Sequence, residues 1–356
     1  MLLLERIFLK MFRYLPANAR RVAETVILSL LAGGAAVLFL KTTNILFNYI
    51  YEFLKPFPVS VFAAGSFVAI VGSSLVVCFL LRWAPEAAGS GIPQLKAAYW
   101  KDLGFVPWRP IFVKFIAGVV SLGGGMSLGR EGPTVYLCGG LASAFSGYLG
   151  KPKHARRFAL TAGAAAGLAA AFNTPFAAIT FVLEELVGDL GNRYLGGVVL
   201  ASVTGALVVQ ASIGRQPAFI LPAANDSTLE MYVLLPLVAV AATLCGMAFD
   251  KGALFLRKRL KRQQRVRHWL LPLFGGLLTW CIAIGAYRYT GKIGVFGLGY
   301  GDLSEALANG IAWKIAGILT LAKIAATITG YSFGGCGGIF SPTLFIGGMC
   351  GFFIGG

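Results

Sequence analysis

Charged side chains are scarce in this sequence of 356 residues, because Asp, Glu, Lys and Arg together make up only 13% of it. Soluble globular domains carry about 25%, so the composition excludes an ordinary soluble globule. Histidine occurs only twice, at His154 and His268, and both lie in basic segments. A histidine-based metal or catalytic centre is therefore disfavoured, and we expect neither an enzyme, nor a metal site, nor a cofactor.

Cysteine is present but without the spacing that structural roles require. The six cysteines lie in apolar segments and form no CxxC pair, which argues against a zinc site and against a disulfide framework. We expect buried thiols instead. The residues concerned are Cys78, Cys138, Cys245, Cys281, Cys336 and Cys350.

Acidic residues are also few, 14 against 31 Lys and Arg, which gives a formal net charge of +17. Much of this charge lies in two clusters that flank apolar runs, within residues 6–21 and 257–267. The positive-inside rule places both clusters, and with them the N-terminus, on the cytoplasmic side. Because the basic residues flank apolar runs instead of covering a soluble domain, nucleic acid is not expected as a partner.

Long apolar runs dominate what remains, since 57% of the residues are hydrophobic. Residues 22–39, 59–81, 232–249 and 270–286 each suit a helix that crosses a bilayer about 30 Å thick. We therefore predict an all-α, polytopic protein of the cell inner (plasma) membrane. The amphipathic start, residues 1–21, predicts a cytoplasmic helix at the membrane interface.

Glycine and proline break several apolar segments that are too short for simple spans. These interruptions are GSGIP (89–93), GREGP (129–133), FNTPF (172–176), GLGYG (297–301) and GGIFSP (337–342). Irregular backbone survives in a bilayer only where protein buries it or where it lines a polar cavity. Broken helices of this kind are typical of transporters.

An internal repeat relates the two parts of the chain. Lys114 lies as far before Pro133 as Lys323 lies before Pro342, and the prolines are 209 residues apart. The segment 89–91 aligns with 299–301 at an offset of 210. We predict two homologous halves, 22–212 and 231–356, joined by a polar linker over 213–230. The second half ends soon after Pro342 and is therefore expected to be incomplete.

The broken segments place glycine and proline where new helices begin. The free N–H groups of a first helical turn, together with the helix dipole, can bind an anion. Glu131 lies in such a turn, where its carboxylate can occupy the position of an anion and can also accept a proton. Glu184 and Glu185 form a second acidic point, and Lys114, in an apolar run, is a candidate buried partner for one of them.

Three less specific interpretations stay open at this point. Glycine-rich apolar stretches also serve close helix packing. Glu184 and Glu185 can be an ordinary interfacial pair, and Lys114 can extend its ammonium group toward the membrane surface.

The motifs together resemble those of the CLC family of chloride channels and proton-coupled chloride transporters. GSGIPQLK, GREGPTV and GGIFSPTLFIGG are similar to its three anion-site motifs, and AAAGLAAAFNTPFA with FVLEEL is similar to the stretch after the second. The resemblance implies two inverted-topology repeats of tilted and broken helices, here with the second repeat incomplete.

The resemblance also assigns roles to residues. It makes Glu131 the gating and proton-carrying glutamate, Glu185 with its neighbour Glu184 the internal proton-transfer point, and Lys114 a supporting buried lysine. The residues that it places around bound chloride are Ser90, Gly91, Ile92, Arg130, Gly132, Ile339 and Phe340.

The function implied is chloride/proton exchange, because channel members of the family usually have an apolar residue in place of Glu185. A passive voltage- or pH-gated chloride channel and a non-transporting membrane protein are the alternatives; a fluoride-selective relative is disfavoured by the chloride-type motifs. The partners expected are chloride, protons and lipid. The family is homodimeric, but its central-site tyrosine and last helices do not appear before Gly356, so the oligomeric state of this chain stays open here.

Overall fold

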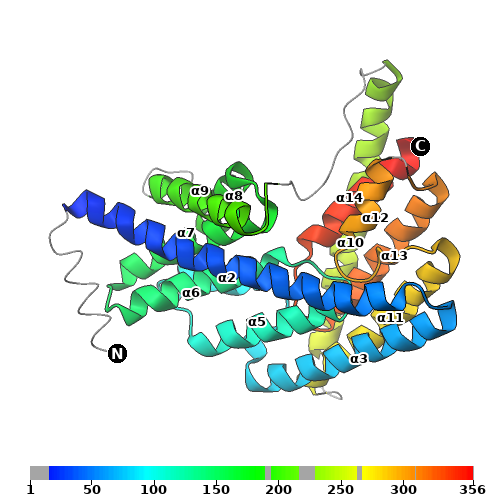
Figure 1. The fold of residues 1–356 in the computed structure, drawn as a ribbon, viewed down its shortest axis with the longest axis horizontal. Helices are drawn as coiled ribbons and strands as arrows, with labels where there is room; N and C mark the ends of the chain where they lie inside the picture. The colour runs from blue at the N-terminus through cyan, green and yellow to red at the C-terminus, as the bar shows by residue number, and fades with distance from the viewer. Residues whose placement is uncertain (1–15, 189–193, 216–228, 263–266, 309, 356) are drawn as a thin grey trace. The chain divides into compact units, whose positions relative to one another are not determined.

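A computed structural model describes residues 16–188, 194–215, 229–262, 267–308 and 310–355. Within these ranges the regular structure is helical, and the β pairing consists of one isolated bridge between Gly129 and Gly338 (Figure 1). The all-α prediction is confirmed. The predicted amphipathic segment 1–21 and the linker 213–230 fall largely outside the described residues.

Six helices of the described part are long and apolar enough to cross a membrane. They are α2 (Ala17–Leu54), α3 (Val59–Trp83), α9 (Leu195–Ser212), α10 (Leu229–Arg262), α11 (Leu271–Thr290) and α13 (Trp313–Ser332). The four predicted apolar runs lie in α2, α3, α10 and α11, so the prediction of a polytopic membrane protein is confirmed.

The other α-helices connect these spans, and many of them begin at the glycine and proline motifs. They are α4 (Ile92–Trp100), α5 (Trp108–Gly123), α6 (Glu131–Tyr148), α7 (Lys153–Phe172), α8 (Pro175–Phe181), α12 (Tyr300–Leu307) and α14 (Phe340–Gly355). Five of them, α4, α5, α6, α8 and α14, carry a proline within their first three residues. Proline suits this position because the missing N–H has no intrahelical acceptor there.

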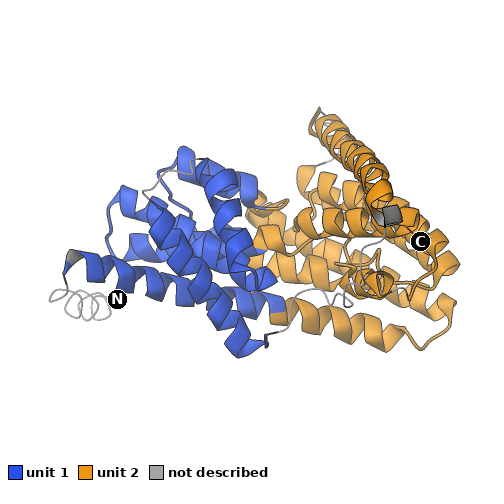
Figure 2. Cartoon of the chain, turned by 90° about the horizontal axis from the view of Figure 1, so that it is seen from above, with its two compact units in different colours: residues 1–40, 91–112, 134–217 blue, residues 41–90, 113–133, 218–356 orange. Residues whose placement is uncertain are grey.

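The chain forms two compact units (Figure 2). Unit 1 comprises Met1–Leu40, Gly91–Phe112 and Thr134–Pro217. Its interior depends on small residues, since α9 lies so close to α7 that a Cβ on Gly205 would meet the carbonyl oxygen of Ala166 at 2.2 Å. A Cβ on Gly163 would likewise lie 2.4 Å from the carbonyl oxygen of Cys138. Close backbone approach of this kind is a usual way for membrane helices to pack.

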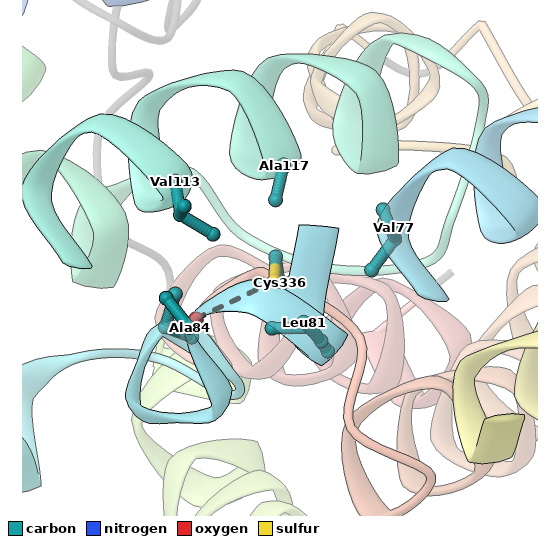
Figure 3. Packing of buried hydrophobic residues seen from close by; sticks show 7 residues of the cluster. Val77, Leu81, Ala84, Val113, Ala117 and Cys336 are labelled. Atoms are coloured by element: carbon teal, nitrogen blue, oxygen red, sulfur yellow. Dashed lines mark hydrogen bonds between the residues drawn. The ribbon is translucent and has the colours of Figure 1, made fainter. Parts of the chain in front are cut away.

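Unit 2 comprises Lys41–Ser90, Val113–Pro133 and Ala218–Gly356, and α11 packs in it against α3 and α13. One of its apolar clusters is built from Val77, Leu81, Ala84, Ala87, Val113, Ala117 and Cys336 (Figure 3). The Cys336 thiol donates to the carbonyl oxygen of Ala87 at 3.4 Å. Four of the six cysteines are buried free thiols as predicted, whereas Cys245 is half-buried and Cys281 is exposed.

The internal repeat is visible in the helix starts. The first residues of α6 and α14, Glu131 and Phe340, keep the predicted offset of 209. The match predicted further upstream is wrong by two residues. The left-handed caps of α4 and α12 are Gly91 and Gly299, so the segment equivalent to 89–91 is 297–299. The glycines at both ends of each segment have positive φ, and this backbone requirement decides the register.

Candidate functional site

Glu131 lies at the start of α6 in unit 2, and its side chain is buried, with 1% of the residue exposed. The bridge between Gly129 and Gly338 holds the N-terminal ends of α6 and α14 together: the Gly129 N–H donates to the Gly338 carbonyl at 2.7 Å, and the reverse bond measures 2.6 Å. Gly129 and Gly338 occupy equivalent positions in the two repeats, so the repeats pair here through equivalent residues. A carboxylate is thereby placed beside the helix N-terminus of the other repeat.

Three donors converge on the Glu131 carboxylate. The Tyr300 hydroxyl donates to Oε1 at 2.8 Å, and the Ser341 hydroxyl donates to the same oxygen. The Ser341 N–H, in the first turn of α14, donates to Oε2 at 3.3 Å. The free N–H groups and dipole of a helix N-terminus favour an anion at this position. The carboxylate thus occupies a site whose chemistry suits an anion.

Arg130, next to Glu131 in the chain, contacts Tyr300 and Asn44. Its guanidinium carbon lies 5.3 Å from the centre of the Tyr300 ring, and its Nη1 donates to Asn44 Oδ1 at 3.3 Å. Arg130 and Tyr300 line a cavity of about 580 Å³, together with Lys55 and Lys292. Glu52, Asp302 and Glu305 line the same cavity, so its positive and negative side chains are equal in number. The cavity gives the polar face of the site room for water and ions.

Ser90 is buried and lies against the first turn of α6. A Cβ on Gly132 would sit 2.7 Å from the Ser90 carbonyl oxygen, so glycine at 132 is required for this approach. The Gly89 N–H donates to the Gly335 carbonyl at 3.2 Å, which fixes the same loop to the segment before α14. Gly91 and Ile92 belong to unit 1, as the cap and the first residue of α4.

The GGIFSP motif supplies the start of α14. Ile339 precedes the helix and accepts the Thr343 N–H at 3.0 Å through its carbonyl oxygen, while Phe340 is 43% exposed. Phe340 is the repeat equivalent of Glu131, so only one of the two equivalent positions carries a carboxylate.

Lys114 is fully buried, and its pairing with Glu184 or Glu185 stays a prediction. Its ammonium group donates to the carbonyl oxygen of Ala87 at 2.8 Å and also to that of Gly89. Carbonyl groups of an irregular loop have no partner in a helix or sheet, so they need another donor when they are buried. Lys114 therefore fixes the loop that carries Ser90.

Glu184 and Glu185 lie in unit 1 in a π-helical turn, Val182–Val187, after α8. Both are exposed, and Glu185 Oε1 forms an ion pair with Lys96 Nζ of α4 at 3.0 Å. Glu185 is therefore held by a basic residue that the sequence analysis did not single out. No group of three or more metal-ligating side chains occurs in the described ranges.

Two residues of the site, Tyr300 and Ser341, were missed at the sequence level. They lie 169 and 210 residues after Glu131, so no local pattern connects them with it. The sequence marks these two residues only through their position inside GLGYG and GGIFSP, two of the segments that interrupt apolar runs.

Comparison with known proteins relates the chain to a family of chloride channels and transporters. The family model described as "Voltage gated chloride channel" matches residues 72–356. The "H(+)/Cl(-) exchange transporter ClcA" of Vibrio cholerae serotype O1 is 31% identical over 347 residues, which cover 93% of this chain and 71% of that protein. The protein of the same name from Salmonella agona is 30% identical over 297 residues, which cover 82% of this chain and 60% of that protein.

Solved structures share the fold. A slow cyanobacterial Cl−/H+ antiporter aligns with a TM-score of 0.80 and 22% identity over 92% of this chain and 76% of that one. A CLC-type fluoride/proton antiporter aligns with a TM-score of 0.74 and 20% identity over 92% and 79%. From the family model and the identity to the Vibrio cholerae protein, the chain belongs to the voltage gated chloride channel family, the CLC family.

Proposed function

We propose that this chain exchanges chloride for protons across the bacterial inner membrane, with its N-terminus in the cytoplasm and Glu131 as the gate. The observation that supports the proposal most strongly is the position of the Glu131 carboxylate, buried among the Tyr300 hydroxyl, the Ser341 hydroxyl and the Ser341 N–H. These donors suit a chloride ion as well as a carboxylate. Relatives named as H(+)/Cl(-) exchange transporters support the same function.

The exchange follows from competition at this site. While Glu131 is ionised, its carboxylate takes the place of the anion. When it accepts a proton it loses the charge that the helix N-terminus favours, and chloride can replace it. One carboxylate thereby couples proton uptake to chloride entry. Neutral dipoles and hydroxyls also bind chloride weakly enough for it to leave.

The other predicted site residues take the roles that the family resemblance gives them. Ser90 and, at the start of α14, Ile339 and Phe340 are proposed to bind the central anion. Arg130 and Gly132 are proposed to form the entrance from the cavity. Glu185, exposed beside Lys96 and accompanied by Glu184, is proposed to pass protons to and from the cytoplasm.

The test is chloride-driven proton movement in liposomes that contain the purified chain. Chloride moving down its gradient should drive protons against theirs. Glu131→Gln and Glu185→Gln should each abolish proton movement and leave chloride flux. Asp250→Asn, which removes an exposed carboxylate on α10, is the matched control and should leave both fluxes unchanged. Chloride flux without proton movement in the unmodified chain would identify a channel, and absence of both fluxes would refute transport by this chain.

A further inference from the structure

Tyr300 and Ser341 contribute two side-chain hydroxyls to one oxygen of Glu131. Tyr300 is the first residue of α12 and Ser341 the second of α14, so three helix starts meet at a single carboxylate. The two hydroxyl oxygens are 2.8 Å apart. Since both approach Oε1, each hydroxyl adds a hydrogen bond to a charged acceptor, and bonds of this kind are about twice as strong as neutral ones.

Packing alone does not require these hydroxyls. A phenylalanine at 300 would keep the ring beneath the Arg130 guanidinium, and an alanine at 341 would keep the backbone N–H that donates to Glu131. The hydroxyl groups therefore add something that the fold does not need, namely donors aimed at the position that Glu131 shares with an anion.

The charged side chains near Tyr300 and Ser341 form hydrogen bonds or ion pairs with other residues. Arg130 lies over the Tyr300 ring and donates to Asn44. On the same helix as Tyr300, Asp302 accepts the Gly294 N–H at 2.5 Å, and Glu305 pairs with Lys292 at 2.5 Å. The two hydroxyls and the Ser341 N–H donate to the carboxylate itself.

We propose that Tyr300 and Ser341 form a hydroxyl latch that holds ionised Glu131 in the anion position and then donates to the transported anion when Glu131 leaves. The latch rests on the exchange function proposed above and specifies which residues set its pH response. In the release step, one proton from water in the adjoining cavity binds a carboxylate oxygen of Glu131. The neutral carboxyl group gives up the hydroxyl donors, and an anion takes them.

The latch predicts a direction for the pH response. Hydrogen bonds donated to a carboxylate favour its charged form over its neutral form. Removing one hydroxyl should move both the protonation of Glu131 and the onset of proton-coupled transport to higher pH. The expected shift is about one pH unit for each hydroxyl, as for the loss of one hydrogen bond to a charged group.

The experiment titrates the Glu131 carboxyl band by infrared difference spectroscopy, with Glu131→Gln to assign the band, and measures the pH profile of proton flux in liposomes. The variants are Tyr300→Phe and Ser341→Ala. Tyr289→Phe is the matched control, because the Tyr289 side chain is 87% exposed on α11. Tyr300→Phe decides the test if Ser341→Ala fails to fold, since it keeps the ring under Arg130.

An upward shift of the infrared midpoint in Tyr300→Phe, absent in Tyr289→Phe, supports the latch. An unchanged midpoint overturns it, even if the unmodified chain exchanges chloride for protons. Conversely, a shifted midpoint in a chain that moves no protons would refute the exchange function and leave the hydroxyl contacts with Glu131 established. The spectroscopic result thus separates the two proposals.

Discussion

Replacing Lys323 by methionine is expected to lower the free energy of unfolding by about 2–4 kcal/mol. Lys323 is fully buried in α13, and its ammonium group donates to the carbonyl oxygens of Gly294 at 2.9 Å and Gly297 at 2.7 Å. It also lies 5.1 Å from the centre of the Phe345 ring. Methionine keeps most of the volume but cannot donate, so two buried carbonyls lose their partner.

The magnitude follows from those two carbonyls. Each buried acceptor that loses its donor costs about 1–3 kcal/mol. Part of this loss is recovered because methionine need not bury an ammonium charge. Lys114→Met should cost a similar amount, since Lys114 donates to the carbonyls of Ala87 and Gly89 in the equivalent loop.

The measurement is unfolding of the purified chain in mixed detergent micelles by titration with sodium dodecyl sulfate, followed by circular dichroism. Lys314→Met is the matched control, because Lys314 is exposed on the same helix. It should change the free energy of unfolding by less than about 0.5 kcal/mol, as is usual for surface substitutions. If Lys323→Met cost no more than Lys314→Met, the buried lysines would not stabilise the loops before α12 and α4.

Three further substitutions test the packing and the surface. Gly125→Ala should destabilise the fold by more than about 2 kcal/mol or prevent folding, because φ is +100° and a Cβ would lie 1.8 Å from the Tyr51 hydroxyl. The melting temperature in detergent measures this loss, and an unchanged value would contradict the prediction. Gly205→Ala should also lower the melting temperature, since its Cβ would lie 2.2 Å from the Ala166 carbonyl oxygen; an unaltered melting temperature would refute the close approach of α9 to α7. Lys96→Met should alter the unfolding free energy by less than about 1 kcal/mol, because its ion pair is roughly half exposed; a larger loss in the same detergent titration would show that the pair is structural.

The sequence predicted Glu131 because its signal is local. A charged residue inside a glycine-rich, apolar stretch with a proline two positions later indicates a helix start with an unusual carboxylate. The apolar spans were equally predictable, since their length and composition alone match a bilayer. The repeat gave the correct equivalence of Glu131 and Phe340, because helix starts repeat with the proline motif.

Partners contributed by distant segments could not be predicted. Ser341 reaches Glu131 because the pairing of Gly129 with Gly338 brings the starts of α6 and α14 together, and Tyr300 comes from a third helix start, that of α12. The carbonyl acceptors of Lys114 were also missed, because a buried cation suggests an anion and the irregular loop that offers the carbonyl oxygens is not visible in the sequence. Neither the loop conformation nor its unmet acceptors can be read from composition.

The most direct test of chloride/proton exchange is the reversal potential of currents through the purified chain in planar bilayers, measured at a fixed chloride gradient and several pH gradients. Coupled exchange predicts a reversal potential that moves with the pH gradient and departs from the chloride equilibrium potential. Glu185→Gln should return it to the chloride value. A reversal potential that stays at the chloride equilibrium potential for every pH gradient in the unmodified chain would contradict exchange.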